Sequence, residues 1–400
     1  MIKKFSFLVC FVFLLSACSK ENSDKSQNAK DTLEALLPEV IDKINQDYVT
    51  NVSDEKLVES ALNGMLSALD PYSMYLNQKD FERLNEFTKG EFTGIGAQII
   101  VTKGIIKIIA SIDDTPAHNA GLKSGDSITH INGKEVHRLS FNEIADQLHG
   151  APGSEVSLTI SRLDSEPFIV KLIRAVIKVN PVKFSVKDDI AYIRISTFNE
   201  SASIKLQEAL KELKTYQKVQ GLILDLRNNP GGTLEQGIAV ASLFLDSGIV
   251  VDIKSRKPDN NQTIHTNGSD LAKGIPMVVL INKGSASSSE IVAGALKDHK
   301  RAILMGTPSF GKGSVQTVFS MPGYGGICLT TATFFTPKGN EIQNKGIEPD
   351  IIVEEPTKDK EEAIKKIDIP FALEKSDYQL QRAVDLLKGL SLFQIKTSND

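Results

Sequence analysis

Leu222-Ile-Leu-Asp-Leu-Arg-Asn-Asn-Pro-Gly-Gly232 is the stretch of sequence that decides the fold. It begins as a short apolar run and ends in turn-forming residues, so it predicts a buried strand that stops at a glycine-rich turn. A strand that is apolar on both faces is typical of a parallel sheet with helices on both sides. The turn then lies at a carboxyl end of the sheet, where α/β proteins place their sites, although on turn chemistry alone it is equally a plain tight turn.

The segments around this strand repeat the alternation of apolar strands with helices. Further strands are expected at residues 190–195, 277–281 and 302–305, and helices at residues 200–214, 233–246 and 288–299. This alternation predicts an α/β core with a mainly parallel sheet, which we place at residues 177–356. Residues 357–400 are charged and are expected to form a helical C-terminal segment.

Two smaller units are expected before the core. Residues 31–88 carry apolar residues at helical spacing and predict a helical N-terminal segment, broken at Asp70-Pro-Tyr-Ser73. Residues 89–176 combine β-rich runs, turn glycines, a short amphipathic helix at residues 140–148 and a strand at residues 155–160. They predict a compact αβ module of ordinary domain size.

The amino terminus has the features of a secretory signal. Two lysines precede an apolar run, Phe5 to Ala17, that is short for a membrane-spanning helix. The run ends in Leu15-Ser-Ala-Cys18, which resembles the lipobox of bacterial lipoproteins, in which the cysteine is acylated. The alternative is a plain signal peptide with an incidental cysteine. We expect a signal peptide at residues 1–17, lipid on Cys18 and a polar tether at residues 18–30, outside the cytoplasm (in the periplasm if the cell is Gram-negative).

The composition argues against several classes of protein. The chain has 400 residues, of which 41% are hydrophobic and 24% charged, as in an ordinary globular protein. A formal net charge of −4 and the absence of tryptophan do not favour a nucleic-acid-binding surface. Three cysteines cannot build a disulfide framework. No metal or other cofactor is expected.

Gly284-Ser-Ala-Ser-Ser-Ser-Glu290 is the candidate for a nucleophile. It ends a strand and opens a helix, so a serine there would project from a helix N-terminus, whose N–H groups stabilise an oxyanion. The alternative is structural, because Ser287-x-x-Glu290 is also a capping box. Both interpretations hold if a different serine serves as the cap.

A serine nucleophile needs a base, and Lys312 is the candidate. It lies in an apolar, glycine-lined stretch in which burial would lower its pKa. If residues 312–318 form a strand, Gln316 lies on the same face and could orient the amine. The alternatives are an exposed lysine in a glycine turn, or His265 as the base.

Two further motifs are imperfect. Gly306-Thr-Pro-Ser-Phe-Gly-Lys-Gly313 nearly matches a phosphate-binding loop, with Asp225 as a candidate for holding magnesium, but no Ser or Thr follows Lys312 and the next residues are β-like. The same segment contains Ser309-x-x-Lys312, the nucleophile motif of penicillin-binding proteins. That motif needs a helix, which the glycines and the proline here disfavour.

Taken together, these segments resemble the carboxyl-terminal processing proteases, also called tail-specific proteases. The resemblance extends from about Leu33 to Leu387 and rests on the order and spacing of its motifs. These are Leu69-Asp-Pro-Tyr-Ser-Met-Tyr-Leu76, Gly90-Glu-Phe-Thr-Gly-Ile-Gly96, Ala120-Gly-Leu-Lys-Ser-Gly-Asp126, Asp225-Leu-Arg-Asn-Asn-Pro-Gly-Gly232, Gly284-Ser-Ala-Ser-Ser-Ser-Glu-Ile291, Phe310-Gly-Lys-Gly-Ser-Val-Gln316, Thr336-Pro-Lys-Gly339 and Gly346-Ile-Glu-Pro-Asp350.

This family uses a Ser–Lys dyad supported by a glutamine. The resemblance implies Ser287 as the nucleophile, Lys312 as the base and Gln316 as the supporting residue. It implies an oxyanion hole formed by the N–H groups of Ser288 and of Gly231 or Gly232. The family usually has alanine at the position of Ser288.

The resemblance also implies that residues 89–176 form a PDZ domain. Its peptide-binding loop would be Gly94, Ile95, Gly96 and Ala97, followed by an edge strand over Ala97–Val101 that a peptide can extend. Many members have arginine where His149 stands, which puts the regulation of this chain in question.

The expected function is that of a lipid-anchored serine endopeptidase with an acyl-enzyme intermediate. It would cleave extracytoplasmic proteins near their carboxyl termini, and the PDZ domain would capture apolar carboxyl termini of protein or peptide substrates. An adaptor and a homo-oligomer are compatible with the sequence, whereas a nucleic-acid partner is not expected. The alternative is a catalytically silent, PDZ-bearing peptide-binding or chaperone-like lipoprotein.

Overall fold

The structure is a computed structural model of the chain. It describes residues 30–102, 105–111, 115–123, 125–137, 139, 141–163, 165–354 and 377–397. The expected signal peptide, Cys18 and nearly all of the tether lie outside the described residues, as do residues 357–376 of the expected C-terminal segment. Within the part that is described, no helix has both the length and the apolar character needed to span a membrane.

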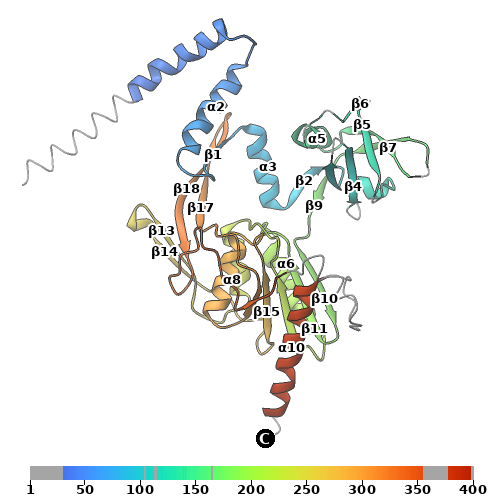
Figure 1. Ribbon diagram of the computed structural model, residues 1–400, viewed down its shortest axis with the longest axis vertical. Coiled ribbons are helices and arrows are strands. Elements are labelled where there is room, and N and C mark those ends of the chain that lie inside the picture. The colour runs from blue at the N-terminus through green and yellow to red at the C-terminus, as the bar shows by residue number, and fades with distance from the viewer. Residues whose placement is uncertain are drawn as a thin grey trace, which may run out of the picture.

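The N-terminal segment is helical, with one short strand that the sequence did not predict. A helix over residues 30–47 is followed by α2 (Asp54–Ser67), β1 (Met74–Leu76) and α3 (Gln78–Lys89) (Figure 1). Asn77 caps α3 by accepting the Asp80 N–H at 2.9 Å. β1 was missed because its partner is β18 (Gly325–Phe335), far away in the sequence.

The αβ module is joined to the rest of the chain by a two-stranded ribbon. In this ribbon β2 (Glu91–Gly94) pairs with β9 (Ala175–Lys178). The module's sheet has the order β3-β4-β5-β7-β8, with β6 paired to β5. Its elements are β3 (Ala97–Thr102), β4 (Ile105–Ser111), α4 (Pro116–Asn119), β5 (Ser127–Ile131), β6 (Lys134–Glu135), α5 (Phe141–Leu148), β7 (Glu155–Ser161) and β8 (Phe168–Ile173).

The core contains the expected mainly parallel sheet. Its order is β10-β11-β12-β15-β16-β19, and only the pair β10 and β11 is antiparallel. The strands are β10 (Val182–Lys187), β11 (Ile190–Ile195), β12 (Gly221–Asp225), β15 (Met277–Ile281), β16 (Ile303–Gly306) and β19 (Ile351–Ile352). The helices are α6 (Ala202–Leu213), α7 (Leu234–Ser242), α8 (Ser288–Asp298) and α10 (Tyr378–Thr397).

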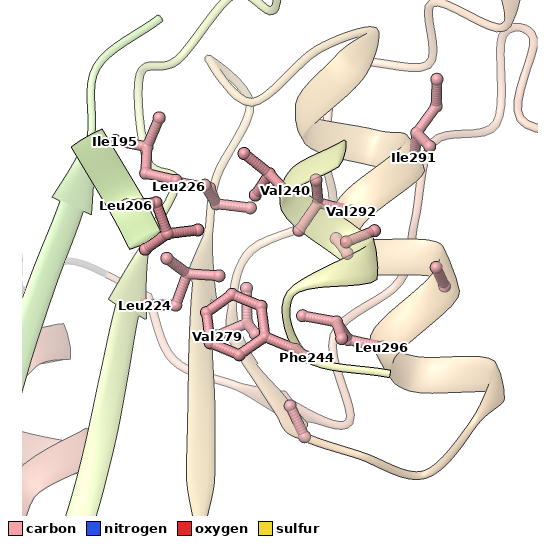
Figure 2. Packing of buried hydrophobic residues seen from close by; sticks show 14 of the residues in the cluster. Ile195, Leu206, Leu224, Leu226, Val240, Phe244, Val279, Ile291, Val292 and Leu296 are labelled. Atoms are coloured by element: carbon pink, nitrogen blue, oxygen red, sulfur yellow. The ribbon is translucent and has the colours of Figure 1, made fainter. Parts of the chain in front are cut away.

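Both faces of this sheet are covered, because its central strands are apolar on both sides. Leu224 and Val279 face α7 and α8, where they meet Phe244 and Leu296 (Figure 2). Ile223, the neighbour of Leu224 on β12, points to the opposite face of the sheet and belongs to the cluster packed against α10. The alternation of side chains along each strand therefore fixes the layers, and the glycine turn emerges at the sheet's carboxyl edge.

A second, antiparallel sheet was not predicted as a unit. Its order is β1-β18-β13-β14, and β17 pairs with the other edge of β18. Its remaining elements are β13 (Ile249–Ser255), η1 (Pro258–Asn260), β14 (Gln262–His265) and β17 (Ser314–Met321). The β17–β18 hairpin extends from the core to the N-terminal helices (Figure 1). The strand expected at residues 312–318 is observed as β17, which begins two residues later, at Ser314, and continues to Met321.

A buried ion network ties α10 to the end of β12. The Arg227 guanidinium is 7% exposed and donates to Asp225 at 2.7 and 3.0 Å. It also donates to Asp377 at 2.6 and 2.7 Å, and Asp377 in turn caps α10 through the Leu380 N–H. Tyr192 adds a hydrogen bond to Asp225 at 2.8 Å. The base of the glycine turn is thus fixed by residues from three parts of the chain.

Replacing the central cation should be costly. We expect Arg227→Ala to lower the free energy of unfolding by about 3–5 kcal/mol, because two carboxylates lose a shared, buried partner. The measurement is urea unfolding followed by circular dichroism. The matched control is Arg256→Ala, which removes an exposed arginine, and an equal effect of both variants would contradict the prediction.

Candidate active site

The serine stretch between β15 and α8 holds the glycine turn in place. The Ser285 hydroxyl donates to the Leu226 carbonyl at 2.8 Å, and the Ser289 hydroxyl donates to the Asn229 carbonyl at 2.9 Å. The Ser288 hydroxyl donates to the Thr233 carbonyl at 2.9 Å. These three serines are buried. Their hydroxyls are therefore structural, and the hydroxyl that replaces the family's usual alanine at Ser288 also anchors the turn.

Ser287 differs from its neighbours in its backbone. Its φ of 56° and ψ of −115° lie outside the regions that non-glycine residues normally adopt. Such strain tends to be retained at functional sites, where the surrounding structure enforces it. Ser287 is also the N-cap of α8, and its N–H donates to Glu290 at 2.8 Å. The strained serine thus occupies the cap position itself, whereas the sequence also allowed a different serine there.

The Glu290 carboxylate joins the serine loop to the lysine loop. It is 0% exposed and accepts four hydrogen bonds. One oxygen accepts the Ser309 hydroxyl at 2.6 Å and the Gly311 N–H at 2.7 Å. The other oxygen accepts the N–H groups of Ser287 at 2.8 Å and of Lys312 at 2.9 Å. The main chains of Ser287 and Lys312 therefore meet at one atom, although the two residues come from different loops.

The Lys312 side chain is half-buried beside this carboxylate. Burial lowers the pKa of the Lys312 amine, and the nearby Cys328 and Glu290 oppose the shift. The amine lies 5.0 Å from the centre of the Tyr72 ring. It is thus set in a partly dry environment, which favours the neutral form that a base requires.

Gln316 lies on β17 just beyond a β-bulge. Its amide nitrogen donates to the Ser314 hydroxyl at 2.8 Å and to the Thr330 hydroxyl at 3.2 Å. The side chain is therefore held by β17 and β18, on the side of the hairpin that follows Lys312.

The glycine turn approaches Ser287 very closely. A Cβ on Gly231 would lie 2.8 Å from the Ser287 Cβ and 2.9 Å from the Ala286 carbonyl oxygen, at a φ of +104°. The Gly231 N–H donates to the Asn229 side chain at 2.9 Å, and the Gly231 carbonyl accepts from Phe198 and Thr197. Only glycine fits this position.

In the αβ module, the loop Gly94 to Ala97 leads from the connecting ribbon into β3. β3 is an edge strand in this sheet, so its outer edge can accept a further strand. The Ile95 carbonyl is bonded to the Ala117 N–H at 2.8 Å, and Gly96 accepts from the Thr115 hydroxyl at 3.2 Å. The loop is thus anchored by residues before and within α4.

His149 lies where α3 meets the module. Its ring is 6.0 Å from the Phe92 ring, and its Nδ1 is 3.9 Å from Glu86. Burial lowers the pKa of His149, while Glu86 opposes the shift. It therefore contacts the N-terminal segment rather than the serine and lysine loops.

The other candidates have different surroundings. His265 is exposed on β14, and Ser309 is bonded to Glu290 in a non-helical loop. Asp225 is occupied by Arg227, and β17 rather than a helix follows Lys312. Within the described residues no group of three or more metal-ligating side chains gathers. Sequence reasoning treated Glu290 only as a capping partner and missed Tyr72, although the Asp70–Ser73 break was visible.

Comparison with protein families matches three parts of the chain. Residues 189–353 match peptidase family S41, residues 108–162 match the PDZ domain, and residues 14–80 match the N-terminal domain of the activating protease CtpB. These matches agree with the architecture of a core, an αβ module and a helical N-terminal segment.

Similar proteins are found at the level of the whole chain. A carboxy-terminal-processing protease of Bartonella bacilliformis is 42% identical over 367 residues, which are 90% of this chain and 85% of that protein. A CtpA-like serine protease of Staphylococcus aureus (strain COL) is 34% identical over 353 residues, 87% of this chain and 69% of that protein. An S41-family structure from Bacteroides fragilis has a TM-score of 0.53 at 17% identity, covering 86% and 92% of the two chains, and thus shares the fold.

Removing the shared carboxylate should loosen both loops. We expect Glu290→Ala to lower the free energy of unfolding by about 3–5 kcal/mol, since two buried and two partly buried donors lose their acceptor. The stability of Glu290→Gln should lie between those of Glu290→Ala and the wild type. Glutamine keeps the size of the side chain but replaces one acceptor oxygen with an N–H donor. Chemical unfolding measures the effect, with the exposed Glu348→Ala as control. A stability equal to that of the control would refute the bridging role.

Proposed function

The chain belongs to the carboxy-terminal-processing serine proteases of peptidase family S41, and we propose that Ser287 is its nucleophile and Lys312 its general base. The observation that carries this proposal is the shared Glu290 oxygen, which holds the main chains of both residues. The relatives are named as proteases, which gives no support to a non-enzymatic peptide-binding lipoprotein.

In the proposed mechanism, the neutral Lys312 amine removes the proton from the Ser287 hydroxyl. The oxygen attacks a substrate carbonyl, and the protonated Lys312 returns its proton to the nitrogen of the leaving amine as the peptide bond breaks. Water, deprotonated by the same amine, then hydrolyses the acyl-enzyme. The lowered pKa of Lys312 supports this role because a protonated amine cannot act as a base. Gln316 supports the hairpin next to the base through its bonds to Ser314 and Thr330.

The proposed oxyanion hole combines the N–H groups of Ser288 and Gly232. Ser288 is the first residue of α8, where N–H groups have no partner in the helix. The peptide between Gly231 and Gly232 is trans, so the Gly232 N–H points opposite to the Gly231 carbonyl. The Gly231 carbonyl accepts from Phe198, and the Gly231 N–H already donates to the Asn229 side chain, which favours Gly232 over Gly231 as the oxyanion donor.

The PDZ domain is proposed to capture the substrate's carboxyl terminus. The loop formed by Gly94, Ile95, Gly96 and Ala97 would hold the terminal carboxylate with main-chain N–H groups, and the β3 edge would pair with the peptide. The chain is proposed to act outside the cytoplasm, on the periplasmic side in a Gram-negative cell, and to be held at a membrane by lipid on Cys18. An adaptor and self-association remain part of this proposal.

The dyad is tested by cleavage of a peptide that ends in an apolar carboxyl terminus. We expect Ser287→Ala, Lys312→Ala and Lys312→Arg each to lower kcat/KM by at least about 10³-fold, as in other nucleophile–base pairs. The arginine variant fails because a guanidinium stays protonated. Product formation is followed by mass spectrometry, with the exposed Lys283→Ala as control. Activity that survives in both Lys312 variants would exclude this base and direct attention to His265.

The capture role is tested by changing the substrate rather than the enzyme. Amidation of the peptide's carboxyl terminus removes the charge that the loop would bind. We expect KM to rise about 10–100-fold with little change in kcat, since charge-assisted hydrogen bonds of about 1.5–3 kcal/mol are lost before the chemical step. Steady-state kinetics on the free and amidated peptides measure this. Equal KM values would count against carboxylate recognition.

A further inference from the structure

The lysine proposed as the base is approached by a residue from outside the core. The Tyr72 ring centre lies 5.0 Å from the Lys312 Nζ. Tyr72 belongs to the turn between α2 and β1, in the N-terminal segment, and is itself half-buried. The core alone therefore does not form the complete surroundings of the amine.

The turn that carries Tyr72 is firmly built. The Asp70 carboxylate accepts the N–H groups of Tyr72 and Ser73 at 2.8 Å each and the Ser73 hydroxyl at 2.8 Å. Burial raises the pKa of Asp70, but these hydrogen bonds outweigh it and hold the pKa below its usual value. The carboxylate is therefore retained at neutral pH, and it fixes the main chain of Tyr72.

The same turn is fastened to β18. The Ser73 hydroxyl accepts the Thr330 N–H at 3.1 Å, and Met74 pairs with Cys328 in the antiparallel register. Thr330 also contacts Gln316, so the contacts continue from the turn to β17. Pairing of β1 with β18 thus places the Tyr72 ring and the lysine loop against each other.

We propose that Tyr72 is a positioning residue for Lys312, whose ring covers the amine and excludes water from it. The N-terminal segment then completes the active site. This inference rests on the proposed role of Lys312 as the base. Among the residues that the structure describes, the other charged or titratable groups that act on the amine are Glu290 from α8 and Cys328 from β18, with Asp70 acting on Cys328.

Two effects of the ring oppose each other. An aromatic face attracts a cation and so favours the protonated amine, by less than about one pH unit at a partly exposed site. Exclusion of water favours the neutral amine, and burial is the stronger influence on lysines in proteins. Burial is also the largest influence on the pKa of Lys312, which is lowered. Loss of the ring should therefore raise the pKa.

The test is the pH dependence of kcat/KM for the full chain in detergent, with the peptide used above. Activity depends on the neutral amine, so it falls as the pH drops below the pKa of Lys312. We expect Tyr72→Ala to move this acidic limb to higher pH by about one unit, with about a tenfold loss at pH 7 that is recovered in alkali. Tyr72→Phe should keep the wild-type profile. Tyr72→Leu keeps an apolar side chain over the Lys312 amine, so it should not shift the acidic limb of the kcat/KM profile to higher pH.

The controls separate the ring from the segment that carries it. Tyr75→Ala alters β1 elsewhere, where the Tyr75 hydroxyl donates to the Tyr324 carbonyl, and should leave the limb in place. An unchanged limb in Tyr72→Ala, a pH-independent loss, or an equal shift in Tyr72→Leu or Tyr75→Ala would overturn the inference. Should Lys312→Ala keep the wild-type pH profile, the proposed base itself would fail, and that outcome is distinct from all of these.

Discussion

The buried carboxylate of Glu290 is the group on which the geometry of the site depends. A charge removed from water must be satisfied by donors of the protein, and here the donors are supplied by α8's own cap and by the loop from Ser309 to Lys312. Neither loop is regular secondary structure that would fix it independently. Glu290 therefore links the main chains of Ser287 and Lys312. A main-chain bond from the Phe310 N–H to the Ser285 carbonyl at 2.9 Å joins the same two loops a second time.

The serine stretch holds the glycine turn in place through its side chains. Ser285, Ser288 and Ser289 use their hydroxyls to hold carbonyls of the glycine turn, which lets the turn and the start of α8 approach within contact distance. Gly231 has no side chain that would push them apart. A nucleophile and an oxyanion hole need this closeness, because donors must be placed where charge develops.

The sequence was informative where structure is local. The strands at 190–195 and 277–281 have the bounds expected from the sequence, and the second of them is apolar and buried throughout. β1, β13 and β18 were not predicted, since their stability comes from partners far away in the chain. The serine stretch, Lys312 and Gln316 were candidates from their residue types and spacing, and the resemblance then singled out Ser287 as the nucleophile. That Glu290 joins the two loops could not be read from a capping pattern, which describes one helix end only.

The position of the proposed base, Lys312, explains why the N-terminal segment would be needed at the site. The carboxyl edge of an α/β sheet is open to solvent, which suits substrate entry but leaves a lysine there in water and protonated. Helices on the faces of the sheet cannot cover that edge. In this chain the β17–β18 hairpin leaves the core at Lys312 and pairs with β1, which brings the Asp70–Ser73 turn to the amine. If Lys312 is the base as proposed, the antiparallel extension serves the chemistry of the parallel core, and the helical N-terminal segment contributes to the proposed active centre.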